Sequence, residues 1–374
     1  MRATLIFAVL LVATACRGPG PAAPAASCTR VRAERTVEGT VLCEDAWTCG
    51  RPPGGKFDRV GLHRLAACDA PADAPVLLYL PGMHMNGELP IADPQNDLRL
   101  FLAVRGVRTW GLDYRSHAVP PTATAQDLEI LAGWTSDVFR EDAAWAAGFV
   151  RAAEGRLDHV AGFSHGAVMA YELASRRVAP KLGLVILDGA LPEARETQPG
   201  GPAIDVAGGR LSYDVRRRLM EAVIADPDGP SPLSGFASAG EALKTVLYSA
   251  SSFGGRGGLA NTRDEVSDPT VLATLLRGYD RWWPRAAVGG RAPSPPAEPV
   301  PVLAFASGRL GPAWAERVRR SATAFGKERA TIVELPGYGH LDVLVAREAA
   351  REVFAPVRDW IMPADGAPPS STAR

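Results

Sequence analysis

Six short apolar runs alternate with helical stretches over most of the chain, and this alternation restricts the fold more than any other feature. The run VLLYL at 76–80 is apolar throughout and ends in Pro81-Gly82, which is typical of a strand buried on both faces. Strands that alternate with helices predict an α/β fold with a mostly parallel, doubly wound sheet. The runs lie at 76–80, 107–112, 157–163, 184–187, 300–306 and 331–335, and helices are expected at 142–153, 167–177, 314–324 and 342–360.

One long interval interrupts the rhythm, because about a hundred residues separate the runs that end near 187 and begin near 300. A structureless loop of that length is uncommon inside a compact domain. Residues 191–299 are therefore expected to form a cap inserted over the carboxyl edge of the sheet. The core then comprises 74–190 and 300–362, and the proline-rich residues 363–374 are expected to be a disordered tail.

The N-terminus has the pattern of a bacterial export signal. Arg2 precedes the short apolar run LIFAVLLV at 5–12, which is too short for a permanent membrane span. Small residues at 13–15 follow, and Cys16 comes next, as in lipoprotein signals where this cysteine is acylated. Residues 1–15 are interpreted as a signal peptide and 16–27 as a proline- and alanine-rich tether. The alternative is ordinary secretion with cleavage at the same place, and both interpretations predict export to the periplasm or the outer envelope.

The remaining cysteines all lie in residues 28–73, ahead of the first core strand. They are Cys28, Cys43, Cys49 and Cys68. In an exported protein such a set predicts two disulfides, with three pairings left open. A zinc site is the competing interpretation, but the spacings contain no Cys-x-x-Cys pair.

Charge points to no polyanionic partner, because 41 Lys and Arg balance 41 Asp and Glu. A chain with this balance is not expected to bind nucleic acid. A membrane contact is expected only through an acylated Cys16, and the oligomeric state is left open.

One serine lies between two glycines in Gly162-Phe163-Ser164-His165-Gly166. The pattern is short enough to occur by chance, but here it joins a buried strand to an alanine-rich helix. A sharp turn at that junction exposes the serine hydroxyl at the carboxyl end of the sheet, beside the N–H groups that begin the helix. Glycines fit on both sides because side chains there would collide with neighbouring backbone. Ser164 is therefore the candidate nucleophile.

A nucleophilic serine needs a base, and His340 is the best placed of the six histidines. It lies in Gly337-Tyr338-Gly339-His340, between the last strand and the last helix, and so at the same sheet edge as Ser164. His165 is adjacent in sequence but is expected to point away from the serine. His84 and His117 lie on loops at this edge and are candidates to line the site.

With these motifs in this order, the chain resembles an α/β-hydrolase over residues 74–362. Leu80-Pro81-Gly82-Met83 resembles the oxyanion loop of that family, and the stretch 98–115 is similar, more faintly, to acid lipases and related esterases. The resemblance implies an oxyanion hole built from the backbone N–H groups of Met83 and His165, each contributing about 3 kcal/mol to transition-state stabilisation. It implies no cofactor and no metal.

The third member of a catalytic triad departs from the family pattern. The acid usually follows the strand that corresponds to 300–306, but no carboxylate stands there. Asp188, which ends the preceding strand, keeps the family order Ser, Asp, His and is the first candidate. Glu316 is an alternative, and so is Asp342, although Asp342 is also a plausible N-cap of the last helix. A dyad without an acid is the remaining possibility.

These residues together predict an exported serine hydrolase that cleaves a small carboxylic ester through an acyl-enzyme. A competing enzyme interpretation is a cap-bearing aminopeptidase, whose substrate amine would need carboxylates such as Glu193, Glu196 and Glu221. A binding protein on an inactive hydrolase scaffold is the hypothesis from another class, suggested by the missing acid. The cap aromatics suit either an apolar acyl pocket or a small core of the cap itself, and they are Phe253, Tyr279, Trp282 and Trp283.

Overall fold

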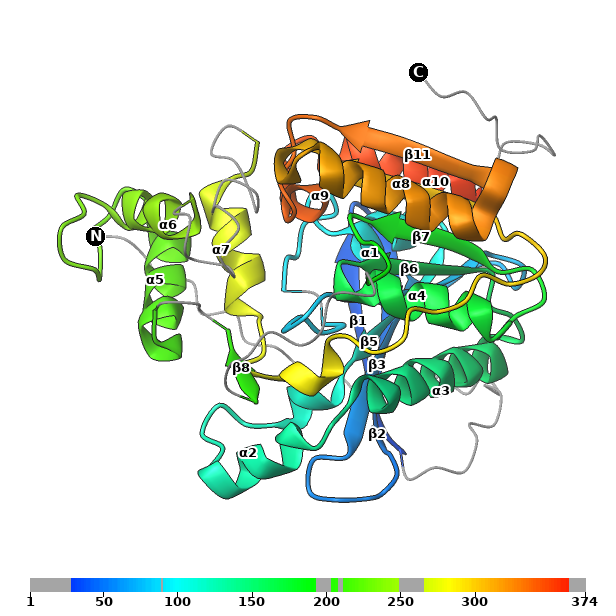
Figure 1. Ribbon diagram of the computed structural model, residues 1–374. Coiled ribbons are helices and arrows are strands. Elements are labelled where there is room, and N and C mark those ends of the chain that lie inside the picture. Colours follow the sequence, from blue (N-terminus) through cyan, green and yellow to red (C-terminus); the bar gives the residue numbers. More distant parts are fainter. Residues whose placement is uncertain (1–27, 89, 193–202, 208–210, 249–265, 363–374) are drawn as a thin grey trace.

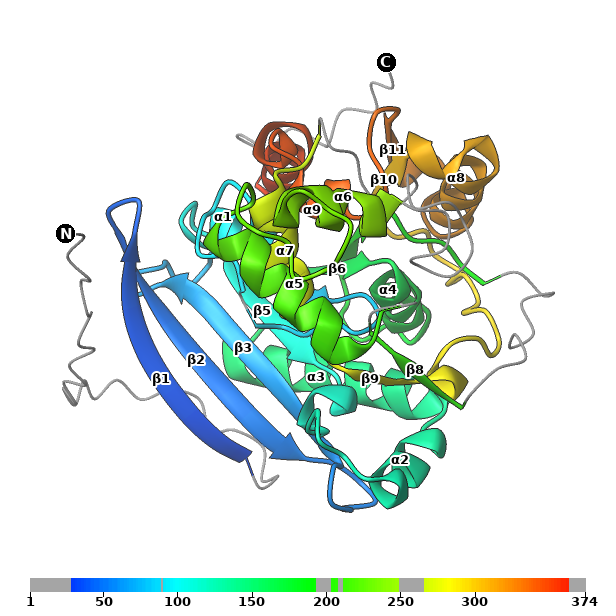
Figure 2. The same cartoon turned by 90° about the vertical axis from the view of Figure 1, so that its left-hand side faces the viewer.

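A nine-stranded sheet forms the centre of the molecule in the computed structural model, which describes residues 28–88, 90–192, 203–207, 211–248 and 266–362. Its strands lie in the order β1-β2-β3-β5-β4-β6-β7-β10-β11, and the six from β5 to β11 in this order are parallel (Figures 1 and 2). The strands are β1 (Cys28–Val37), β2 (Thr40–Gly50), β3 (Arg59–Ala67), β4 (Val76–Leu80), β5 (Arg108–Asp113), β6 (His159–Phe163), β7 (Gly183–Leu187), β10 (Val302–Ser307) and β11 (Ala330–Leu335). All six expected strands are present, which confirms the mostly parallel α/β fold.

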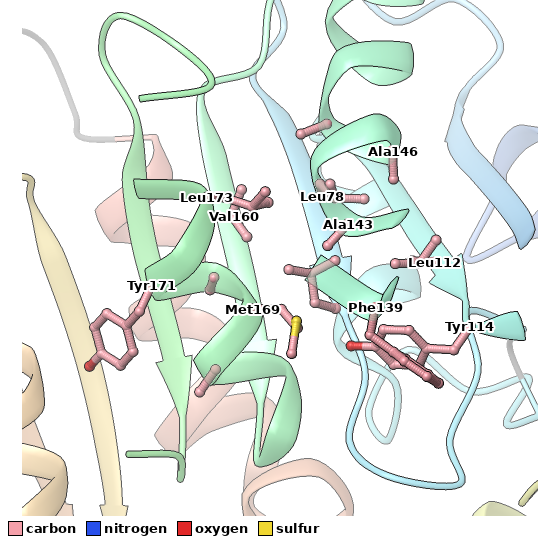
Figure 3. Close-up of a cluster of buried hydrophobic side chains, with 14 of the residues drawn as sticks. Leu78, Leu112, Tyr114, Phe139, Ala143, Ala146, Val160, Met169, Tyr171 and Leu173 are labelled. Carbon is pink, nitrogen blue, oxygen red and sulfur yellow. The ribbon is translucent and has the colours of Figure 1, made fainter. Parts of the chain in front are cut away.

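Helices cover both faces of the parallel part, because successive strand residues point to opposite sides of a sheet. On one face Leu78 and Val160 pack with Phe139 and Ala143 of α3 and Met169 of α4 (Figure 3). On the other face the alternate strand residues pack against α1 and the C-terminal helices. The helices of the core are α1 (Leu98–Ala103), α2 (Ala125–Ala132), α3 (Ser136–Glu154), α4 (His165–Ser175), α8 (Pro312–Gly326), α9 (Asp342–Val345) and α10 (Ala355–Ile361).

The cysteine-containing segment extends the sheet. Strands β1, β2 and β3 are antiparallel, and β3 pairs with β5 at the edge of the parallel region (Figure 2). The two expected disulfides are present, and they join Cys28 to Cys49 and Cys43 to Cys68. Within the described part of the chain the only cluster of possible metal ligands is Glu34 with Cys43 and Cys68. Both of those sulfurs are held in a disulfide, so the zinc alternative is wrong for these cysteines.

The interval between β7 and β10 has structure of its own, as the length argument predicted. It contains α5 (Tyr213–Ala225), α6 (Ala239–Tyr248), α7 (Pro269–Arg277) and a small sheet of β8 (Ile204–Val206) with β9 (Trp282–Pro284). The three helices form a group beyond the end of the sheet toward which the arrow of β11 points (Figure 1). The cap therefore stands at the carboxyl edge, where the candidate site is expected.

The expected helix over 342–360 is interrupted, which corrects the sequence prediction. α9 ends at Val345, and a π-helical turn (Ala350–Phe354) precedes α10. At the break, Ala346 forms a β-bridge with Ser267 of the cap, and the Arg347 N–H donates to the Val266 carbonyl oxygen at 2.8 Å. Contacts with the cap thus replace helical hydrogen bonds. No helix within the described ranges is long and apolar enough to cross a membrane.

Candidate active site

Ser164 lies in a strained turn between β6 and α4, with φ +52° and ψ −115°. Glycines permit the close approach of three chain segments at this point. A Cβ on Gly162 would lie 2.4 Å from the Gly166 carbonyl oxygen, and one on Gly189 would lie 2.7 Å from the Ser164 carbonyl oxygen. The Ser164 N–H donates to the Leu187 carbonyl at 3.1 Å. A non-glycine residue keeps a positive φ only where its surroundings fix the backbone, and these contacts fix Ser164.

His340 reaches Ser164 from the loop between β11 and α9. Its Nε2 lies 2.8 Å from Ser164 Oγ, so the serine hydroxyl is placed to donate to the imidazole. The His340 ring stacks on Phe163, with ring centroids 4.8 Å apart. A hydrogen bond within this loop holds its backbone, because the Gly339 N–H donates to Asp342 Oδ2 at 2.6 Å. The nucleophile and base chosen from the sequence therefore lie in hydrogen-bond contact.

Asp188 contacts the other nitrogen of the His340 ring. His340 Nδ1 donates to Asp188 Oδ2 at 2.6 Å, and the carboxylate is fully buried. Ser307 donates twice, through its N–H to Oδ1 at 2.8 Å and through Oγ to Oδ2 at 2.7 Å. Trp314 Nε1 donates to Oδ1 at 2.9 Å. Four donors thus compensate the desolvation of this carboxylate and fix its orientation toward the histidine.

Ser307 and Trp314 were missed by the sequence reasoning. Ser307 ends β10, the position at which the resemblance places an acid, and here it holds an acid that comes from β7 instead. The sequence does show a serine at the position where the family usually has its acid. The role of this serine can be inferred only once Asp188 is known to lie next to it.

The other two acid candidates do not contact the His340 ring. Glu316 lies on the exposed side of α8 and forms an ion pair with Arg319 at 2.5 Å. Asp342 is buried and accepts from Ser267 Oγ at 2.5 Å as well as from the Gly339 N–H. It is the first residue of α9 and not its N-cap, so the capping interpretation is wrong. Its contacts brace the loop that carries His340.

The two backbone donors suggested by the resemblance come from two segments, the start of α4 and the loop after β4. His165 is the first residue of α4, so its N–H has no acceptor within the helix. Met83 lies in the loop after β4, where Tyr114 Oη donates to the Pro81 carbonyl oxygen at 3.1 Å. The His165 ring packs edge-on against Trp283 at 5.5 Å and against Tyr114 at 6.3 Å. Burial lowers the pKa of His165 to about 4, so this imidazole is neutral near pH 7.

The cap aromatics fit neither interpretation fully. Trp283 is fully buried and packs against Phe139 of α3 at 5.0 Å, so it belongs to the main core and not to a separate core of the cap. Trp282 is also buried, and its Nε1 donates to the Pro120 carbonyl oxygen at 3.0 Å. Phe253 lies outside the described residues.

A second carboxylate–histidine pair lies near the candidate triad. His63 Nε2 is 2.7 Å from Asp113 Oδ2, and the Gly87 N–H donates to Asp113 Oδ1 at 2.6 Å. His117 Nε2 lies 4.0 Å from the same carboxylate. Gly61 makes room for it, since a Cβ there would lie 2.0 Å from Asp113 Oδ2. Burial opposes the charge of Asp113, but the hydrogen bond and attraction from His63, with His117 and Gly87, hold its pKa below the usual range.

One solved structure shares this architecture at low sequence identity. A putative lipase from Sulfolobus solfataricus matches with a TM-score of 0.69 at 22% identity, over 86% of this chain and 94% of that one. A thermophilic esterase from Thermogutta terrifontis matches with a TM-score of 0.43 at 16% identity, over 88% of this chain and 98% of that one, which is too low to establish a common fold by itself. No family model and no curated protein matches the sequence. The first match supports a shared fold.

Proposed function

We propose that this chain, which has the α/β-hydrolase fold, is a serine hydrolase that cleaves carboxylic esters through an acyl-enzyme. The observation that carries the proposal is the continuous relay from Ser164 Oγ to His340 and from His340 to Asp188, with contacts of 2.8 and 2.6 Å. These are hydrogen-bond distances suited to proton transfer from the serine, and the third group orients the base.

The relay has a definite proton arrangement. A carboxylate only accepts hydrogen bonds, so Asp188 holds the proton of His340 on Nδ1 and leaves Nε2 free to accept from Ser164. Ser164 attacks the ester carbonyl as its proton moves to Nε2, and the backbone N–H groups of Met83 and His165 stabilise the oxyanion. His340 then protonates the departing alcohol. Water, activated by the same imidazole, attacks the acyl-enzyme and releases the acid and Ser164.

The alternative functions receive less support from the described residues. The binding-protein hypothesis rested on a missing acid, whereas Asp188 contacts His340 directly. The aminopeptidase hypothesis needs a cluster of cap carboxylates. Glu193 and Glu196 lie outside the described residues, and Glu221 is half-exposed on α5 and pairs with Arg217 at 3.5 Å. An ester therefore remains the preferred substrate class.

The test is covalent labelling of the purified mature protein with a fluorophosphonate probe. We expect labelling of the parent, none of Ser164→Ala, and severely slowed labelling of His340→Gln. Ser175→Ala, at the opposite end of α4, is the matched serine control and should label as the parent does. A folded parent that resists both the probe and a panel of short- and long-chain esters would contradict the proposal. Equal labelling of Ser164→Ala would show that another nucleophile reacts.

Export, with a lipid anchor at Cys16, is a further part of the proposal. Its support is the signal-like sequence at 1–15 and the two disulfides, which are typical of proteins that fold in an oxidising compartment. Mass spectrometry of the N-terminus after bacterial expression should find an acylated Cys16, and Cys16→Ser should be released from the membrane fraction. An uncleaved N-terminus in the cytosol would contradict both export interpretations.

A further inference from the structure

The segment that carries Met83 is tied to the cap at Asp280 and Gly278, and also at Asp205, whose Oδ2 lies 3.3 Å from His84 Nε2. The Asp280 N–H donates to the His84 carbonyl oxygen at 2.7 Å, and His84 Nδ1 donates back to the Asp280 carbonyl oxygen at 2.9 Å. Asn86 Nδ2 donates to Asp280 Oδ1 at 3.2 Å and to the Gly278 carbonyl oxygen at 3.0 Å. Asp280 thus holds His84, directly after Met83, through its backbone, and it holds Asn86 through its carboxylate.

The hold is needed because His84 has an unfavourable backbone conformation. Its φ is +61°, a backbone conformation that a non-glycine residue keeps only where its surroundings fix it. The flanks of the loop are fixed by the core, through Tyr114 on Pro81 and Asp113 on Gly87. For the residues between these flanks, the ties just described run to the cap, mostly to its segment 278–280.

The Asp280 side chain is itself buried and fixed, and burial raises the pKa of its carboxyl group while His117 and Asn86 act to lower it. Its side chain is 8% exposed, and His117 Nδ1 donates to Oδ1 at 2.7 Å. Burial disfavours the charge of His117, but hydrogen bonds to Asp280 and Glu88 and attraction to Asp113 raise its pKa to about 11. A histidinium therefore faces the carboxylate at neutral pH. Two donors, Asn86 and His117, converge on one oxygen and set the direction of the carboxylate.

The same cap segment also contacts the second oxyanion donor. Trp283 follows Asp280 by three residues and packs edge-on against the His165 ring at 5.5 Å. It also lies against Tyr114, the residue that holds Pro81, at 5.4 Å. Both backbone donors of the proposed oxyanion hole are thus next to residues that touch the segment 280–283.

We propose that Asp280 is a positioning residue that couples the cap to the oxyanion hole by fixing the loop that carries Met83. The inference rests on the proposed serine hydrolase function and goes beyond it, because it gives the cap a part in transition-state stabilisation in addition to any part in substrate binding. A displacement of about 1 Å in such a donor is enough to cost up to about 100-fold in rate.

The experiment compares Asp280→Ala, Asp280→Asn and Asn86→Ala with the parent on one soluble ester. Asp228→Asn is the control, since Asp228 is an exposed carboxylate of the same cap with no contact to the loop. Asp280→Ala keeps the two backbone hydrogen bonds to His84 and removes the carboxylate that accepts from Asn86 and His117. We expect it to lower kcat about 10-fold with KM within about twofold. Asp280→Asn should recover most of the loss, because its amide oxygen still accepts from Asn86.

A trifluoromethyl ketone supplies a readout that a purely structural role would not move. Its adduct with the serine carries an oxyanion, so its inhibition constant should rise by the same factor as kcat falls, while the pH profile keeps its shape. Because Asn86 donates to the Gly278 carbonyl oxygen as well as to Asp280, the double variant Asp280→Ala/Asn86→Ala should lose more kcat than Asp280→Ala alone, but less than the product of the two single losses.

The outcomes separate the two proposals. A folded Asp280→Ala with kcat and inhibitor binding within about twofold of the parent overturns the inference and leaves the hydrolase proposal intact. A loss confined to KM also overturns it, because it would place Asp280 in substrate binding. If Asp280→Ala does not fold, Asn86→Ala decides, with an expected loss of about 5-fold. A parent that is neither labelled nor active overturns both.

Discussion

Two carboxylate–histidine pairs lie near the carboxyl edge of the sheet, and they are almost equal in geometry. Asp188 meets His340 at 2.6 Å, and Asp113 meets His63 at 2.7 Å. Both carboxylates are buried at strand ends, and both accept a backbone N–H. The two pairs differ at the second ring nitrogen of the histidine. His340 Nε2 contacts Ser164 Oγ, whereas no serine, threonine or cysteine contact of His63 is found in the described part of the chain.

The charges around the two carboxylates also differ. Apart from its histidine, Asp188 is held by neutral donors, the hydroxyl and N–H of Ser307 and the indole of Trp314. In the proposed mechanism its charge stabilises the imidazolium that forms on His340. Asp113 already has a second positively charged neighbour. His117 Nε2 lies 4.0 Å from Asp113 Oδ2, and the pKa of His117 is raised. A carboxylate–histidine contact alone is therefore no evidence of catalysis, and the charge left uncompensated is more informative.

The largest expected difference is between the two histidines. His340→Gln removes the base, and kcat should fall by about 10⁵-fold or more, as for other catalytic triads. His63→Gln should keep kcat within about threefold and lower the free energy of unfolding by about 1 to 3 kcal/mol, because Asp113 loses a charge-assisted hydrogen bond. Ester turnover and urea unfolding of both variants measure this. Comparable losses of kcat in the two would remove the distinction between the pairs.

The two carboxylates give the next largest difference. Asp188→Asn presents an amide to His340 Nδ1 and favours the tautomer with its proton on Nε2, so kcat should fall by about 10⁴-fold with the fold retained. Asp113→Asn should act mainly on stability and reduce kcat by less than about 10-fold. Single-turnover rates with an activated ester separate the two effects. A fully active Asp188→Asn would assign the orienting role to another group.

The parallel core and the serine turn were predictable because their signals are local. A continuous apolar run such as 76–80 and the glycines around Ser164 each describe their own surroundings. His340 followed from the same logic, since parallel strands end at one edge. Asp188 was harder, because the choice among three carboxylates depended on which one the sheet brings to the ring.

Long-range contacts explain what the sequence did not reveal. Ser307 and Trp314 lie 119 and 126 positions from Asp188 in the sequence, and no local sequence pattern around either residue predicts a contact with Asp188. The break in the expected 342–360 helix arises from a bridge to Ser267 in the cap. The cysteines predicted two disulfides, but the antiparallel strands that carry them follow from pairing with β5, which no local pattern shows.

Ser307 offers a smaller test of how far the setting of Asp188 matters. Ser307→Ala removes the hydroxyl donor to Oδ2 and keeps the backbone donor to Oδ1, so Asp188 should be held less firmly. We expect kcat to fall by about 3- to 10-fold, in line with the loss of one hydrogen bond of about 1 kcal/mol. Ser321→Ala is the control, because Ser321 bonds within α8 and to Leu191 and not to Asp188. A loss of equal size in both would indicate general destabilisation.

The smallest effect is a pH dependence of stability that belongs to Asp113. Its pKa in the folded protein lies below the value of about 3.9 expected for an unfolded chain. A depressed pKa contributes stability that is present above the unfolded pKa and is lost as pH falls through the folded one. The free energy of unfolding of the parent should therefore exceed that of Asp113→Asn by a constant amount from about pH 5 to 7, and the excess should shrink below about pH 4. Urea unfolding at half-unit pH intervals measures it. An excess that persists undiminished to pH 3 would mean that packing of this side chain, and not its charge, stabilises the second pair.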